Sequence, residues 1–365
     1  MNKISVRQAM MLVITMVFSP AVRLFSAFVS GRGNQGSWLA PLIACVLMIS
    51  FLPILNFFIR RNRNFYQQLE YSFGLYVSKI IGFFYVIWGI LLTSVQMRYY
   101  AGRVASTIYT EIGMDVFLLV MLFLCIYVLK DGIGTLARMN ELLLPLITAV
   151  TAVLLIFLTP DIEIKVLAPV NDWRSLVHVA VFNMASLGYV TFTVFFTDEI
   201  NQREHFKKSG VLLIFSVTLF AVWLFVTVIG TLGPQIIRKL PYPFFAVVKQ
   251  ISVGEFLQHI EAFVITLWIL SDFVLISFIG SATVKMIGQM TRSRRREEIN
   301  IPFFVLCASL VSLMGRTNYE LEALSEKVFI PLNLIFLFLI PIITVIAGAL
   351  KEKTVARKRK NVVYY

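Results

Sequence analysis

Long apolar segments separated by short polar connections run through the whole chain. Many of them approach the roughly 20 residues that an α-helix needs to cross a bilayer, and helix tilt accommodates other lengths. The pattern predicts ten spans, near residues 8–30, 38–59, 76–102, 116–129, 141–158, 174–197, 210–232, 258–284, 301–314 and 328–350. We therefore expect an all-α integral membrane protein with ten transmembrane helices.

The connections between these spans are too short for a soluble domain. The longest, at about 233–257, contains the sequence LPYP and then an amphipathic stretch that predicts a short interfacial helix. We expect a single polytopic domain with one repeat at about 1–158 and a second at about 170–350, followed by a basic cytoplasmic tail at 351–365.

Two of the predicted spans break near their middles. The first break surrounds Pro20, whose ring and missing N–H disrupt helical hydrogen bonds, and the second surrounds Gly188, which can take backbone angles closed to other residues. Because the breaks lie five spans apart, they fit a five-plus-five inverted repeat with broken helices 1 and 6, whose ligand site lies at mid-membrane. Ordinary close packing of small residues is the alternative in the sixth span.

The predicted ligand site takes its residues from the first, third, sixth and eighth spans. Arg23 could clamp a ligand carboxylate, or it could pair permanently with Asp272, the deepest acid of the eighth span. Asp272 could instead pair with Arg98 or exchange a proton. The candidate residues are Ser19, Pro20, Arg23, Gln96, Tyr100, Ser186, Gly188, Tyr189 and Asp272.

Composition and charge agree with a membrane protein. The chain is 58% hydrophobic and carries a net charge of +13, but its basic residues stand in short runs between apolar segments. With the N-terminus inside, 22 of the 33 Lys and Arg residues fall on the cytoplasmic side, which predicts that both termini are cytoplasmic. The basic run at 357–360 is then expected to contact anionic lipid, and a nucleic-acid partner is not expected.

Enzyme chemistry finds little support in the chain. The three histidines are scattered, and we find neither a nucleophile–base motif nor a phosphate-binding loop. We expect no catalytic residues, metal or cofactor. Cys45, Cys125 and Cys307 are expected to be small core residues, and the carboxylates of Asp198 and Glu199 are expected to be solvated at a cytoplasmic helix end.

Several landmarks together resemble the B-subunit family of spore nutrient-germinant receptors, a branch of the amino acid, polyamine and organocation transporter superfamily. They keep one order and spacing through nearly the whole chain, at residues 4–8 (ISVRQ), 36–39 (GSWL), 132–145, 166–169 (VLAP) and 242–243 (YP). The first break departs from the glycine-rich form of related transporters, since SPAVR stands there.

The resemblance implies a receptor subunit that senses a small nutrient such as an amino acid, assembled with A and C subunits in the spore inner membrane. It also implies a transporter-like fold with unwound first and sixth helices. An ion-coupled amino-acid transporter is the alternative, because it needs the same pocket. A scaffold without a ligand is a third possibility.

Overall fold

The computed structural model describes residues 3–22, 25, 28, 32–107, 113–240, 242–250, 260–293, 297–315 and 317–362. Within them, each of the ten predicted spans has a helical counterpart. These are α1 (Val6–Val22), α3 (Ala40–Arg61), α5 (Leu75–Thr107), α6 (Met114–Leu129), α7 (Ile133–Leu158), α8 (Trp173–Leu187) with η5 (Gly188–Glu199), α9 (Phe206–Ile237), α11 (Ile260–Met290), α12 (Glu297–Leu310) with η8 (Val311–Leu313), and a last run from α13 to α15.

Length and composition agree with this membrane assignment. Seven of the helical runs are long and apolar enough to cross a membrane, and three shorter apolar helices lie at 6–18, 114–129 and 298–313. The last run is continuous and consists of α13 (Asn318–Leu324), η9 (Ser325–Phe329), α14 (Ile330–Leu334), η10 (Ile335–Leu339) and α15 (Ile340–Val362), of which η9 and η10 are π-helical.

Short elements connect the spans. They are β1 (Ile4–Ser5), η2 (Gln35–Leu39), α4 (Phe65–Phe73), η3 (Thr159–Asp161), η4 (Ile164–Leu167), β2 (Ile200–Asn201), η6 (Arg203–His205) and α10 (Pro243–Val248). The predicted interfacial helix corresponds to α10, but its side chains Phe244 and Val247 are buried in the core. It therefore packs against the bundle and does not lie on the surface.

The boundaries of several spans differ from their predicted positions, and two of these differences have a clear physical reason. Helix α7 begins at Ile133, eight residues before the apolar segment starts, because a helix continues through polar residues that hydropathy excludes. Helix α9 is assigned to Ile237, but Gly233 has φ of 71° and Pro234 follows it. A positive φ and a proline both interrupt helical winding, so the regular part ends where the apolar segment ends.

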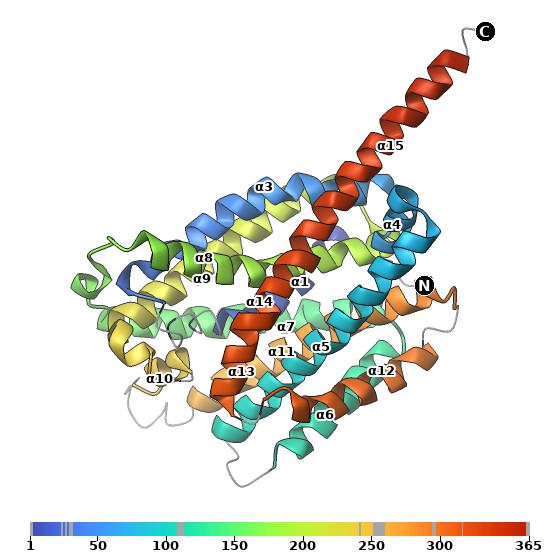
Figure 1. Cartoon of the computed structure of the whole chain (residues 1–365). Helices are drawn as coiled ribbons and strands as arrows, with labels where there is room; N and C mark the ends of the chain where they lie inside the picture. The colour runs from blue at the N-terminus through green and yellow to red at the C-terminus, as the bar shows by residue number, and fades with distance from the viewer. Residues whose placement is uncertain are drawn as a thin grey trace.

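Both broken helices are joined at one end of the bundle. Strand β1, which precedes α1, pairs in parallel with β2, which follows η5, with Ile4 opposite Ile200 and Ser5 opposite Asn201. The N-terminus, α4 and the far end of α15 lie toward this same end, and α10 lies at the opposite end (Figure 1). Helix α15 continues out of the bundle as a helix to Val362.

The buried side chains form two hydrophobic clusters. The larger one contains much of α1, α5, η5 and α11, and it includes Cys125 and Cys307. The smaller one is built around α9, α8 and the end of α7. The three cysteines are buried, as expected of small core residues.

Candidate ligand site between the broken helices

Helix 6 changes its winding where the sequence predicted a break. The α-helical part, α8, ends at Leu187, and the 12-residue 3₁₀ segment η5 begins at Gly188. Runs of 3₁₀ helix beyond three or four residues are uncommon and often mark a functional hinge. The φ and ψ of Phe196, −107° and 16°, interrupt this segment a second time. The predicted break of helix 6 is therefore confirmed.

Packing, and not backbone freedom, accounts for the glycine at this break. Gly188 has φ of −58° and ψ of −17°, which any residue can adopt. A Cβ at this position would overlap the ring of Phe338 and would also contact Leu337. Our expectation that Gly188 supplies unusual backbone angles was wrong, and its role is to let the two helices approach closely.

Helix 1 ends near its predicted break. Helix α1 is assigned through Val22, so Ser19 and Pro20 lie in its last turn, and their side chains fall outside the described part of the structure. Arg23 also lies outside the described residues. Because Pro20 has no N–H, the carbonyl of Met16 receives no hydrogen bond from it.

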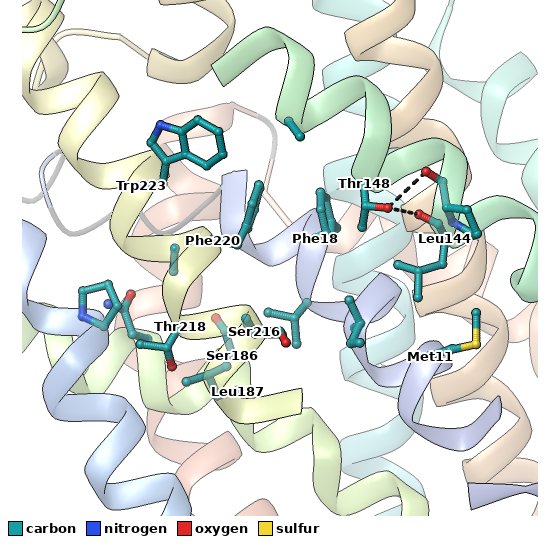
Figure 2. A pocket seen from close by; sticks show the side chains of 18 residues that line it. Met11, Phe18, Leu144, Thr148, Ser186, Leu187, Ser216, Thr218, Phe220 and Trp223 are labelled. Carbon is teal, nitrogen blue, oxygen red and sulfur yellow. Dashed lines mark hydrogen bonds between the residues drawn. The ribbon is translucent and has the colours of Figure 1, made fainter. Parts of the chain in front are cut away.

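A cavity of about 370 Å³ lies beside both breaks. Phe18, next to Ser19, and Ser186 and Leu187, next to Gly188, belong to its wall (Figure 2). The remaining lining residues are Met11, Ile14, Val17, Pro41, Leu144, Pro145, Thr148, Ala152, Asn183, Ser216, Val217, Thr218, Phe220, Ala221 and Trp223. The wall is thus made by α1, α7, α8 and α9, with one residue from α3.

The wall is apolar apart from a few neutral polar side chains. The hydroxyl of Thr148 donates to the carbonyl of Leu144 at 2.8 Å and that of Pro145 at 3.0 Å, so its single donor is used within its own helix. Asn183 is only 2% exposed, and neither its amide nitrogen nor its carbonyl oxygen has a hydrogen-bond partner among the described residues. The hydroxyl of Thr218, 4% exposed, is also without one.

The structure distributes the predicted site residues over the cavity wall and the packed core behind it. Ser186 lines the cavity. The amide nitrogen of Gln96 donates to the phenolic oxygen of Tyr189 at 2.8 Å, which joins α5 to η5 inside the protein. Tyr100 is also buried on α5. Two of the predicted site residues, Gln96 and Tyr189, are therefore hydrogen-bond partners of each other.

Asp272 forms a buried ion pair with Arg103. Both side chains are at most 3% exposed, and the guanidinium carbon of Arg103 lies 5.1 Å from the ring centre of Trp268. The sequence predicts Arg23 or Arg98 as the partner of Asp272, and the structure gives Arg103 instead. The Nε–H of Arg98 donates to the carbonyl of Gly315 at 3.1 Å.

A much smaller cavity, of about 20 Å³, lies between these two regions. Phe18 and Phe220 line both cavities, and their rings stack with centroids 4.5 Å apart. Trp268 forms part of the far wall of the small cavity. The two phenyl rings therefore separate the large cavity from the region of the Arg103–Asp272 pair.

The sequence did not predict one ionic cluster that the structure contains. Lys285, whose side chain is 2% exposed, binds the carboxylates of both Asp198 and Glu199, the latter at 2.7 Å. Asn64 also donates to Asp198 at 3.4 Å. Our expectation of solvated carboxylates was wrong for Glu199, whose side chain is 10% exposed, because α11 brings a buried cation to the end of η5, whereas the side chain of Asp198 is 31% exposed. The signal in the sequence was a lysine at the very edge of an apolar span.

Comparison with known proteins identifies the family. A family model described as "Spore germination protein" matches residues 3–319, which is most of the chain. The chain belongs to this spore germination protein family.

Curated relatives from this family cover nearly the same length. Spore germination protein KB of Bacillus subtilis (strain 168) is 23% identical over 363 residues, which are 96% of each protein. Spore germination protein XB of Bacillus anthracis is 19% identical over 318 residues, 84% of this chain and 87% of the relative. The resemblance of the sequence to spore germination proteins is thereby confirmed.

Solved structures show that this member of the spore germination protein family has a transporter fold. The crystal structure of MhsT in complex with L-phenylalanine has a TM-score of 0.63 at 14% identity, covering 96% of this chain and 99% of that protein. A substrate-bound, outward-open Na⁺-coupled sialic acid symporter also has a TM-score of 0.63, at 12% identity, covering 92% of this chain and 79% of that protein. The all-α, inverted-repeat fold predicted from the spans is therefore confirmed.

Proposed function

We propose that this protein is the membrane subunit of a spore nutrient-germinant receptor, which binds a small nutrient at mid-membrane and thereby triggers germination. The single observation that supports this most is the position of the large cavity, whose wall includes residues adjacent to both breaks, Phe18 on one side and Ser186 and Leu187 on the other. A ligand in this cavity would contact both interrupted helices at once.

Such contacts could convert binding into a signal. A ligand shifts a conformational equilibrium only by its difference in affinity for the two states. The angle between α8 and η5 can change at the Leu187–Gly188 junction, and the wall of the cavity changes with it. A nutrient that fits one angle better therefore favours that conformation, and the receptor complex responds to it.

The surroundings follow from the same proposal. The subunit lies in the spore inner membrane with both termini in the cytoplasm, and it assembles with A and C subunits. The basic runs at 60–63 and 351–353 lie on the side of the bundle where the N-terminus and the end of α15 are found, which supports this orientation (Figure 1). The nine residues predicted from the sequence, Arg23 included, remain the proposed ligand site. Ser186 belongs to the cavity wall, and Gln96, Tyr189 and Asp272 belong to the packed core behind it.

Thermal unfolding with candidate nutrients tests this proposal. A ligand that binds only the folded protein stabilises it by RT ln(1 + L/Kd), where L is the free ligand concentration, so the unfolding temperature rises with ligand concentration. We expect one or more germinant nutrients to do so with purified full-length protein, and to lose this effect in Ala152→Phe, which fills the cavity. If no nutrient raises the unfolding temperature of the protein, alone or with its A and C subunits, the result supports a scaffold without a ligand.

A secondary amino-acid transporter is the second candidate. The fold shared with MhsT and with a Na⁺-coupled symporter favours it. Uptake of labelled amino acids into proteoliposomes under a Na⁺ or H⁺ gradient distinguishes the two functions. Accumulation above the no-gradient control supports the transporter, whereas nutrient binding without accumulation supports the receptor. Neighbouring genes for a lipoprotein and a larger membrane subunit would also support the receptor.

A further inference from the structure

We propose that the large cavity takes an uncharged, mainly apolar molecule that carries one amide or hydroxyl group, and that this molecule enters from the bilayer between α7 and α9. The inference rests on the proposed function, because it specifies the ligand class and the entry route of the same cavity. Three features of the cavity carry it: where its mouth lies, the absence of charge among its described lining residues, and two buried polar groups without partners.

The mouth of the cavity lies between α7 and α9. The exposed lining residues are Pro145 and Thr148 on α7 and Ser216 on α9, whereas Val17, Asn183 and Leu187 on α1 and α8 are buried. Figure 2 shows Thr148 and Leu144 on one side of the cavity, with Phe220 and Ser216 across from them. An entering molecule would therefore pass between these two helices.

The surface around this mouth is apolar. On α7, Leu142 is 78% and Leu146 51% exposed, and on α9, Phe215 and Leu219 are each 62% exposed. Both helices are membrane spans by length and composition. Large exposed apolar side chains on a membrane span face hydrocarbon, so the mouth opens into lipid. A molecule that dissolves in the bilayer reaches the cavity directly.

The lining residues that the structure describes carry no charge. An ionised carboxylate or ammonium held by these residues alone would lose its hydration without gaining an ionic partner from them, which is strongly unfavourable. The volume of about 370 Å³ lies within the range of about 300 to 1,000 Å³ typical of small-molecule sites. Size and polarity together favour a compact neutral molecule.

Asn183 and Thr218 define the polar part of the ligand. The carboxamide of Asn183 offers both a donor and an acceptor, and the hydroxyl of Thr218 can act as either. Both side chains are nearly fully buried, line the cavity from α8 and α9, and have no partner among the described residues. Buried polar groups are rarely left unpaired, so a ligand amide or hydroxyl that bonds to them is favoured over an all-carbon molecule.

Four probes of similar shape test the ligand class. Phenylacetamide has the neutral amide, and in isobutylbenzene two methyl groups replace the oxygen and nitrogen of that amide. Phenylacetate carries a negative charge, and L-phenylalanine is zwitterionic. Binding to the full-length protein in phosphatidylcholine nanodiscs would be followed by the fluorescence of Trp223, which lines the cavity, with Trp223→Phe as the blank. With each affinity expressed relative to the probe concentration dissolved in the bilayer, we expect phenylacetamide to bind about 3- to 10-fold more tightly than isobutylbenzene, and the two charged probes to bind weakest.

Matched variants test the two polar groups. Asn183→Leu should weaken phenylacetamide binding about 3- to 10-fold and leave isobutylbenzene binding unchanged. Asn140→Leu is its control, because Asn140 is equally buried and unpartnered but lies outside the cavity wall. Thr218→Val and Thr227→Val form a second such pair on one helix, since the Thr227 hydroxyl is also buried and unpartnered.

The entry route is tested separately. Ser216→Trp places a large ring in the mouth and should slow phenylacetamide binding, whereas Phe123→Trp, at an exposed position of α6, which does not line the cavity, should not. Phosphatidylcholine with brominated acyl chains should quench Trp223, and bound phenylacetamide should reduce that quenching. Equal binding rates in the two tryptophan variants would overturn the lipid route.

The inference on ligand class fails if isobutylbenzene binds as tightly as phenylacetamide, if Asn183→Leu and Asn140→Leu behave alike, or if none of the probes binds. It also fails if phenylacetate or L-phenylalanine binds best and competes for Trp223, but that result would leave the proposed nutrient-binding function intact. The proposed function fails on its own test, when no nutrient stabilises the protein.

Discussion

The phenyl rings of Phe18 and Phe220 stack with centroids 4.5 Å apart and form the partition between the two cavities. Phe18 precedes the break of helix 1, and Phe220 belongs to α9. A movement at the break of α1 would therefore shift Phe18 against Phe220. This relationship connects the large cavity to the region of Trp268, Arg103 and Asp272.

Removing one ring should join the cavities and weaken the bundle. Phe220→Ala is expected to lower the free energy of unfolding by about 3 kcal/mol, because the space left behind lies between packed helices. Phe215→Ala, on the exposed face of the same helix, is the control and should change it by no more than about 0.5 kcal/mol. Thermal unfolding in detergent measures both. Equal effects would show that the ring pair contributes nothing to packing.

The buried ion pair should be sensitive to the loss of either partner. Asp272→Asn or Arg103→Gln leaves one buried charge uncompensated and is expected to cost about 3 to 5 kcal/mol. The double variant should recover much of this loss, because no charge is then left alone. Yield and unfolding temperature of the four proteins form a double-mutant cycle. Additive losses would show that the two side chains are not coupled.

The cluster around Lys285 is expected to hold the end of η5 against α11. Lys285→Met leaves the carboxylates of Asp198 and Glu199 without their buried cation, and the β1–β2 pair next to them should open more often. Hydrogen exchange at Ile200 and Asn201 should then become faster. Lys207→Met, an exposed lysine nearby, should leave the exchange unchanged. Unchanged protection in Lys285→Met would separate the cluster from the strand pair.

Asn183 should reduce the stability of the empty protein. Replacing its unpartnered carboxamide with an apolar side chain of similar size removes a buried unsatisfied group, so Asn183→Leu should raise the free energy of unfolding by about 1 to 3 kcal/mol. The same variant should respond less to germinants, since stability gained at a binding site commonly costs function. Thermal unfolding and germination of spores carrying the variant measure the two effects. A destabilised Asn183→Leu protein would mean that the carboxamide is satisfied in the membrane.

Arg23→Ala is expected to abolish the nutrient response while the protein still accumulates in the membrane. An ionisable group within a membrane span is costly and is retained for a reason, which we predict to be ligand binding. Germination assays with immunoblots of spore membranes distinguish response from accumulation. Loss of the protein itself would instead indicate a structural ion pair.

The sequence by itself determined the ten spans, the family resemblance and the places where helices 1 and 6 stop being regular. Each of these depends on local composition: runs of apolar residues long enough to cross lipid, and Pro20 and Gly188 within two of them. Local composition also marked Gln96 as a polar residue within an apolar span and a candidate for the site. It did not show that Gln96 donates a hydrogen bond to Tyr189.

Only the tertiary structure decided which side chains meet. Asp272 pairs with Arg103 because α5 and α11 cross at that depth, and Lys285 reaches Asp198 and Glu199 because the end of η5 lies against α11. The cavity wall comes from α1, α7, α8 and α9. Asn183 belongs to this wall because the rotation of α8 about its axis points that side chain toward the cavity. Helix rotation and crossing angle set these contacts, and they result from packing among residues that lie far apart in the chain.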